Sequence, residues 1–124
     1  MKRNETCENY LEAIQIISLN KQGVKAIDVA RYLNFARATV SVALKELEKD
    51  GFIRFEKYNI FLTPKGLKIA NMMYERHEYI AQLLMHYGVD QKTAYEDSCK
   101  IEHDLSQKSF EAIKKATEDL IKHC

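Results

Sequence analysis

Apolar residues recur at helical spacing near the start of the chain. They form two rows, one of Tyr10, Ile14 and Ile17 and the other of Ala13, Ile16 and Leu19. Residues three and four positions apart share one face of a helix, so the rows predict a helix over 9–20. Because there are two rows, we expect this helix to be packed on both sides.

Two more helices are predicted before residue 50. The first is short, from Ile27 to Leu33, and a break is expected at 34–36. The second extends from Arg37 to Lys49, and its inward row consists of Val40, Ala43, Leu44 and Leu47. Asp50-Gly51 is expected to end it, since glycine tolerates the positive φ that often follows a helix.

The pattern then changes from helical to extended. β-prone runs at 52–55 and 60–62 flank a polar turn at 56–59, which predicts a β-hairpin. Thr63-Pro64 follows directly and combines an N-cap residue with proline at the first helical position. That pair is a strong signal for a helix start.

Three helices are predicted after the hairpin. The first runs from residue 64 to about 87, and Asp90 and Ser106 are expected to cap helices that reach about 105 and 122. The expected fold is therefore mainly α, with a small hairpin between two groups of three helices. We expect an N-terminal domain at 1–63 and a C-terminal helical domain at 64–124.

Composition excludes several classes of protein. Of the 124 residues, 46% are hydrophobic and 30% charged, and 4 Gly and 1 Pro are too few for a disordered or collagen-like chain. No apolar run approaches the ~20 residues that cross a bilayer, and residues 1–8 lack the apolar stretch of a signal peptide. We therefore expect no membrane partner. Cys7, Cys99 and Cys124 are odd in number and form no CxxC pair, so we expect no disulfides and a cytoplasmic protein.

Charge is divided unevenly, although the net charge is only +1. Residues 1–70 hold 12 Lys and Arg against 8 Asp and Glu, whereas residues 71–124 hold 7 against 10. A basic N-terminal half favours a polyanionic partner, although a pattern of this size is often only solvated surface.

The order of helix, short helix, turn, helix and hairpin is typical of a winged helix-turn-helix that binds double-stranded DNA. The outward residues of the third helix would enter the major groove: Arg37, Ala38, Thr39, Ser41, Val42 and Lys45. We expect Arg37 to pair with a guanine edge and Lys45 to contact a phosphate. In the hairpin, Arg54 and Lys57 can reach the neighbouring backbone. A solvated basic face on a protein-interaction module is the alternative.

The C-terminal half carries residues with metal-ligand chemistry. On a helix, offsets of three and four would place Cys99, Glu102 and His103 on one face. They would flank a core row of Ala94, Ser98, Ile101 and Leu105. His77 interrupts an apolar row formed by Met73, Ile80 and Leu84, and Asn9 and Glu12 lie three apart on the first helix.

Each of these residues alone has an ordinary interpretation. A histidine in an apolar row is more often hydrogen-bonded to a carbonyl, and a lone cysteine more often behaves as a small hydrophobe. Burying several polar groups together is costly unless they satisfy one another. A divalent cation would do that for a thiolate, a carboxylate and two imidazoles at once.

The winged helix is followed by Thr63-Pro64-Lys65-Gly66, then Arg76-His77, then Cys99-x-x-Glu102-His103. This layout resembles the diphtheria-toxin-repressor family of metal-dependent regulators in its short two-domain form, from about residue 10 to 106. The resemblance implies a homodimer that binds Fe²⁺ or Mn²⁺ and then operator DNA, repressing metal-uptake genes. It implies that the cation links the two domains through Asn9, Glu12, His77, Cys99, Glu102 and His103.

The chain departs from the family pattern at several of these positions. Asn9 stands where other members have Asp or Met, and its amide oxygen can ligate without charge. Cys99 matches iron-type members, whereas manganese-type members have a bridging Glu there. A thiolate favours Fe²⁺ over Mn²⁺, and Zn²⁺, Co²⁺ or Ni²⁺ would also bind in vitro. Tyr95 and Ala81 replace the ancillary ligands of iron-type members, and Arg37 replaces a small or prolyl residue, so the operator sequence does not carry over.

Three other functions are weighed against this one. A winged-helix regulator could sense an oxidant or small ligand through Cys99, with the neighbouring Glu and His only tuning the thiol. A small metalloenzyme would need an open coordination position and a cleft, and the sequence has no glycine-rich loop or nucleophile elbow, so we expect no enzyme. A plain dimerisation module is the third.

Overall fold

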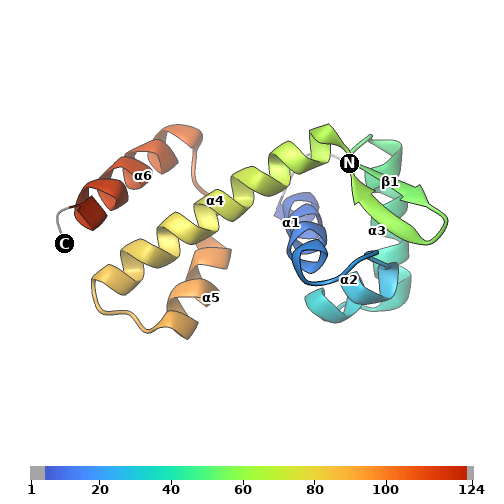
Figure 1. The fold of residues 1–124 in the computed structure, drawn as a ribbon, viewed down its shortest axis with the longest axis horizontal. Helices are drawn as coiled ribbons and strands as arrows, with labels where there is room; N and C mark the ends of the chain where they lie inside the picture. The colour runs from blue at the N-terminus through green and yellow to red at the C-terminus, as the bar shows by residue number, and fades with distance from the viewer. Residues whose placement is uncertain (1–4, 123–124) are drawn as a thin grey trace. The chain divides into compact units, whose positions relative to one another are not determined.

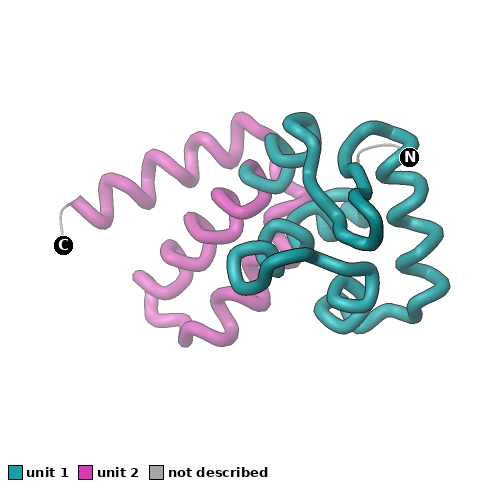
Figure 2. Tube along the Cα trace, turned by 45° about the vertical axis from the view of Figure 1, so that its right-hand side comes forward, with its two compact units in different colours: residues 1–71 teal, residues 72–124 magenta. Residues whose placement is uncertain are grey.

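The computed structural model describes residues 5–122 and consists of two compact units, divided between Asn71 and Met72 (Figure 2). The division falls within one continuous helix, α4, which spans Pro64–His86 (Figure 1). Each unit has buried residues of its own, and each is described by itself below.

Unit 1 contains three helices and a two-stranded sheet (Figure 1). The helices are α1 (Glu5–Asn20), α2 (Ala26–Leu33) and α3 (Arg37–Lys49). The strands β1 (Ile53–Glu56) and β2 (Asn59–Leu62) pair antiparallel. This order confirms the expected winged helix-turn-helix architecture, with α1 beginning at Glu5 instead of residue 9.

The core of unit 1 is formed by the predicted inward rows. Buried members include Tyr10, Leu11, Ile14, Val29, Val40, Leu44, Leu47, Ile53 and Ile60. The second row of α1 is only partly inward, because Leu19 at its end is 68% exposed. The expectation of a helix packed on both sides therefore does not extend to Leu19 in the last turn of α1.

Local hydrogen bonds fix the ends of α2. The Asp28 carboxylate accepts from Lys25 N at 2.9 Å and from Lys21 Nζ at 2.8 Å. The hydrogen bond from Lys21 is the main cause that lowers the pKa of Asp28 below its ordinary value. At the other end, Asn34 adopts a left-handed conformation with φ 58°, a geometry that asparagine accepts more readily than most residues. This is the break expected at 34–36.

The hairpin is tighter than the sequence indicated. Glu56 pairs with Asn59, so only Lys57 and Tyr58 remain in the turn. Lys57 has φ 59°, because a two-residue hairpin turn requires positive φ at its first central position. Ile60 N also donates to Val24 O at 2.7 Å, which ties β2 to the segment after α1.

The start of α4 is held against the beginning of the hairpin. Pro64 is the first helical residue, and Gly66 N donates to Thr63 Oγ1 at 3.2 Å, as the N-cap prediction required. Thr63 Oγ1 in turn donates to Gly51 O at 2.6 Å, and Thr63 N to Phe52 O at 3.0 Å. These bonds fix where the long helix leaves unit 1.

Unit 2 comprises the remainder of α4 with α5 (Gln91–Ile101) and α6 (Gln107–Lys122). The predicted caps are present: Asp90 Oδ2 accepts from Thr93 N at 3.0 Å, and Ser106 Oγ accepts from Ser109 N at 3.1 Å. The hydrogen bond from Thr93 N lowers the pKa of Asp90. The buried residues of unit 2 include Met73, Ile80, Ala81, Ala94, Phe110 and Thr117.

Candidate metal centre and nucleic-acid interface

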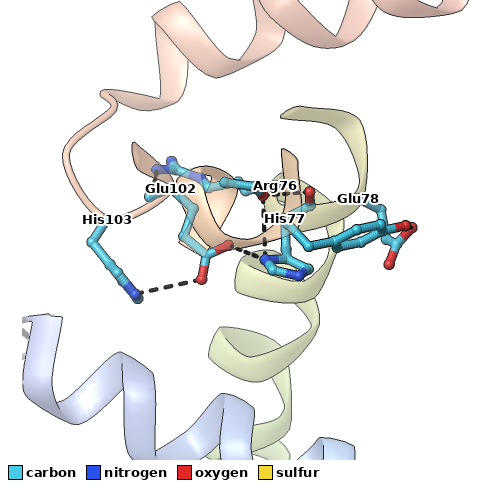
Figure 3. A network of polar contacts seen from close by, with 7 residues as sticks. Arg76, His77, Glu78, Glu102 and His103 are labelled. Carbon is cyan, nitrogen blue, oxygen red and sulfur yellow. Dashed lines mark hydrogen bonds and ion pairs between the residues drawn. The ribbon is translucent and has the colours of Figure 1, made fainter. Parts of the chain in front are cut away.

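A cluster of polar side chains lies inside unit 2, between α4 and the end of α5 (Figure 3). Glu102 Oε2 lies 3.0 Å from His77 Nδ1, and Glu102 Oε1 lies 3.4 Å from His103 Nε2. The side chains of Glu102 and His103 are 0% and 1% exposed, and that of His77 is 17% exposed. Three predicted ligands therefore meet within one unit.

The expectation that Glu102 and His103 lie on a helix was wrong. Helix α5 ends at Ile101, and residues 102–104 form a turn in which Asp104 N donates to Ile101 O at 3.0 Å. The turn directs Glu102 inward and leaves Ile101 38% exposed, the reverse of the predicted helical face. The carbonyl of Glu102, which a continuing helix would bond to the amide four residues on, accepts from Arg76 Nη1 at 2.9 Å instead.

Ser98 contributes a polar contact that the sequence did not predict. It was expected to be a core residue, and it is fully buried. Its Oγ donates to His77 O at 2.6 Å and lies 3.2 Å from His77 Nδ1. A serine at the centre of an apolar row is the signal that could have suggested a hydrogen-bonding partner within α4.

The His77 ring also packs against Tyr95, with ring centroids 5.1 Å apart and the rings tilted by 47°. Tyr95 Oη donates to Glu78 Oε2 at 3.0 Å. Burial and, after it, the hydrogen bond to Glu78 raise the pKa of Tyr95 above its ordinary value, so the phenol is protonated at neutral pH. The histidine is therefore fixed by contacts on more than one side.

Cys99 lies at the edge of this cluster. Cys99 is exposed, whereas the sequence pattern predicted that it lies beside the buried row of the helix. Its Sγ is within 4.8 Å of a Glu102 carboxylate oxygen. A thiol in that position can join the carboxylate and the imidazoles as a ligand while staying accessible to solvent.

The donor set fits a divalent cation. Glu102 Oε1 is buried and receives no hydrogen bond from any residue of the described range 5–122. His103 Nε2 lies 3.4 Å from it, and a buried carboxylate oxygen without a hydrogen bond is costly until a cation binds it. Imidazole, carboxylate and thiolate donors together suit Fe²⁺, Mn²⁺, Zn²⁺ and related ions.

The two predicted ligands of the first helix lie in unit 1. Glu12 lies on α1 and is 5% exposed, and Asn9 lies three residues before it and is partly buried. Of the other cysteines, Cys7 is buried in the core of unit 1, and Cys124 lies outside the described residues. The ordinary interpretation of Cys7 as a small hydrophobe agrees with this burial.

Helix α3 presents the surface that the sequence assigned to DNA. Its inward row is buried, with Val40 and Leu47 at 0% exposure. The outward residues are all exposed: Arg37, Ala38, Thr39, Ser41, Val42 and Lys45. Val42, an apolar side chain, is 65% exposed among them.

The hairpin adds to the same unit a second set of exposed residues. Arg54 forms an ion pair with Glu56 and stacks 4.6 Å over the Phe61 ring, so part of its charge is already compensated. Lys57 is exposed at the turn, and Tyr58 beside it is 83% exposed. A groove of about 530 Å³ is lined by Ser41 and Lys45 of α3, together with Ala26, Leu44, Glu48, Phe55 and Tyr58. The sequence did not single out Tyr58.

In the part of the chain that the structure describes, no helix has the length and apolar character needed to cross a membrane. Comparison with family models matches residues 3–60 to the N-terminal DNA-binding domain of iron-dependent repressors. Residues 63–124 match the metal-binding and dimerisation domain of the same repressors.

Individual relatives agree with both domain matches. The HTH-type transcriptional regulator MntR of Lysinibacillus sphaericus is 36% identical over 107 residues, which cover 86% of this chain and 77% of the relative. An uncharacterized HTH-type transcriptional regulator of Methanocaldococcus jannaschii is 35% identical over 114 residues, covering 90% and 91%.

A solved structure shares the fold. The structure of the manganese regulator SloR superposes with a TM-score of 0.79 at 25% identity, covering 95% of this chain. The chain spans about half of that protein, 55% of its length. Matches to both domain models and a relative above one-third identity establish the family. The chain belongs to the iron-dependent repressor family of metal-dependent transcriptional regulators.

Proposed function

We propose that the chain is a repressor that binds Fe²⁺ or Mn²⁺ and in that state binds operator DNA. Four donors of unit 2 would hold the cation: His77, Cys99, Glu102 and His103. The observation that carries the proposal is the Glu102 carboxylate, which is fully buried, contacts two imidazoles and keeps one oxygen without a hydrogen bond. A bound cation supplies the positive charge that this buried carboxylate lacks.

Glu12 and Asn9 would complete the ligand set from unit 1. This part of the proposal is supported by the family resemblance and by donor chemistry, since a carboxylate and an amide oxygen are common ligands of divalent cations. A cation with ligands on both units would link the DNA-binding domain to the dimerisation domain. By linkage, metal would raise the affinity for DNA, and DNA would raise the affinity for metal by the same factor.

The DNA contacts would come from α3 and the hairpin. Arg37, Ala38, Thr39, Ser41 and Val42 would read base edges or methyl groups, and Lys45 would contact a phosphate. Arg54 and Lys57 of the hairpin would contact the neighbouring backbone. In a homodimer, the two copies of α3 would enter major grooves about 34 Å apart along the duplex. Because the family consists of transcriptional regulators, we expect the protein in the cytoplasm, with no catalytic activity.

The ligand set bears on which metal acts. A thiolate from Cys99 favours Fe²⁺ over Mn²⁺ because it is a softer ligand than a carboxylate. Zn²⁺, Co²⁺ and Ni²⁺ would also bind in vitro, since they lie higher in the affinity order for such sites. Selectivity would then depend on coordination geometry and on metal availability.

The decisive experiment is an anaerobic titration of the protein with Fe²⁺, Mn²⁺ and Zn²⁺, with binding to the promoter of its own operon as the readout. We expect tight DNA binding only in the presence of metal, reversed by a chelator. Binding of equal strength with and without metal would refute the proposal. Unrelated DNA at the same ionic strength provides the control for nonspecific binding.

The exposure of Cys99 favours one second candidate, a regulator that senses an oxidant or small ligand through this thiol without metal. That function predicts DNA binding that responds to peroxide and is insensitive to chelators. The same promoter assay, with peroxide and chelator added in separate reactions, distinguishes the two candidates.

A further inference from the structure

Arg76 is the one arginine among the buried residues of the described chain, at 5% exposure. A guanidinium is always charged in proteins, and burying it is costly unless its N–H groups are used. Arg76 Nη1 donates to Glu102 O at 2.9 Å and to Leu105 O at 2.7 Å, and Nη2 donates to Gln107 Oε1 at 3.0 Å. Its guanidinium also lies 5.3 Å from the centroid of the Phe110 ring.

These partners have a common location. Glu102, Leu105 and Gln107 all belong to the connection from the end of α5 to the first residue of α6. That connection carries Glu102 and His103, two of the proposed ligands. Arg76 and its neighbour His77 therefore hold the same residue from α4, one by the Glu102 carbonyl and the other by the Glu102 carboxylate (Figure 3).

We infer that Arg76 is a positioning residue for metal binding, which fixes the ligand-bearing turn before the cation arrives. The two backbone carbonyls on either side of His103 accept from one guanidinium nitrogen, Nη1, so the turn has little freedom to carry its side chains away from His77. A site that is ordered in advance loses less conformational entropy when it binds. Partners of this kind, one step removed from the metal, typically contribute 10- to 100-fold in affinity.

The inference rests on the proposed function and is tested with Arg76→Met. Methionine keeps an apolar side chain over Phe110 and removes every hydrogen-bond donor of the arginine side chain. Mn²⁺ affinity is measured from the free-ion electron paramagnetic resonance signal, and hydrogen exchange of the amides of residues 101–107 is measured on metal-free protein. We expect Mn²⁺ affinity to fall about 10- to 100-fold and exchange in the turn to accelerate, with the helical circular dichroism and dimer mass retained.

Thr117→Val is the matched control. Thr117 is 1% exposed in the same unit, and its Oγ1 donates only within α6, to Ile113 O at 2.7 Å. It should lower the melting temperature without changing Mn²⁺ affinity more than twofold. Arg76→Lys, which keeps the charge and some donors, should recover part of the affinity.

Unchanged Mn²⁺ affinity in Arg76→Met, or an equal loss in Thr117→Val, would overturn the inference. If Arg76→Met does not fold, Gln107→Ala removes the partner of Nη2 and leaves the two carbonyl contacts of Nη1. It should weaken Mn²⁺ binding by a smaller factor, about threefold, and accelerate exchange in the turn; wild-type values for both would contradict the role of Arg76. Glu102→Ala separates the two proposals, because Mn²⁺ binding that survives it would show that the metal site itself is wrong.

Discussion

The Glu102 carboxylate lies 3.0 Å from His77 Nδ1, across 25 positions of sequence. The contact joins the turn after α5 to the middle of α4, and it uses only one of the two carboxylate oxygens. A hydrogen bond from an imidazole orients the carboxylate and leaves its second oxygen available for a cation. The contact therefore holds two of the proposed ligands of unit 2 next to each other.

The first prediction concerns His103, whose side chain is 1% exposed beside Glu102. His103→Ala should abolish metal-dependent binding to the operator, because one imidazole donor is lost, and it should leave a folded dimer. The measurement is fluorescence anisotropy of labelled operator DNA with and without Mn²⁺ or Fe²⁺. His86→Ala, at the exposed C-terminal end of α4, is the control and should respond to metal as the wild type does. Wild-type metal response in His103→Ala would exclude it as a ligand.

The second prediction concerns metal preference. Cys99→Glu replaces a soft thiolate with a hard carboxylate, which should shift the response towards Mn²⁺. The measured quantity is the ratio of the Mn²⁺ and Fe²⁺ concentrations that give half-maximal operator binding under anaerobic conditions. Cys99→Ser should weaken the response to both ions because a neutral hydroxyl is a poorer ligand. If all three proteins rank the two ions alike, Cys99 does not bind the metal.

Much of unit 1 could be predicted from its sequence because its elements are locally specified. The inward row of α3 was fully predictable, since four apolar residues recur at helical spacing between clear stop signals. The N-cap at Thr63 and the proline after it likewise fixed the start of α4. The hairpin and its turn were predicted, but the turn is shorter by one residue at each end, because the pairing of Glu56 with Asn59 depends on strand register and not on residue type.

The polar cluster of unit 2 was less predictable. Candidate ligands could be named from residue type, but their arrangement depends on where α5 ends, and propensity alone does not locate that end. The hydrogen bonds of Arg76 to the turn after α5 could not be predicted for a related reason. A charged residue in a helix is usually solvated, and only the fold brings the carbonyls of a distant turn within its reach.

The third prediction separates two kinds of DNA contact. Lys45→Ala should weaken binding to every sequence and reduce the slope of log affinity against log salt by about one per subunit, because a phosphate contact releases a counterion. Arg37→Ala should instead relax specificity at one base position, with a cost of about 1–3 kcal/mol on the preferred sequence. The measurements are salt titrations and competition among operators with single base changes. Lys92→Ala, exposed on α5, should change neither; the reverse outcome for Lys45 and Arg37 would mean that their roles are exchanged.

The fourth prediction concerns Gly66 in the first turn of α4. A Cβ at this position would lie 2.0 Å from the carbonyl oxygen of Phe52, a backbone atom that cannot move aside as a flexible side chain can. Gly66→Ala should therefore separate the start of α4 from the hairpin and destabilise the protein by about 3 kcal/mol or more, at the upper end of overpacking effects.

Gly51→Ala is the control for this prediction. Gly51 has φ +83°, but nothing lies within 4 Å of where its Cβ would be, so its substitution costs only the left-handed conformation, about 1–2 kcal/mol. Urea unfolding of both variants, followed by circular dichroism, gives the two costs. A larger loss in Gly66→Ala would show that contact with Phe52 limits this position. Equal losses of stability would mean that α4 can move away from the hairpin. The hairpin would then be less firmly attached to α4 than its hydrogen bonds indicate.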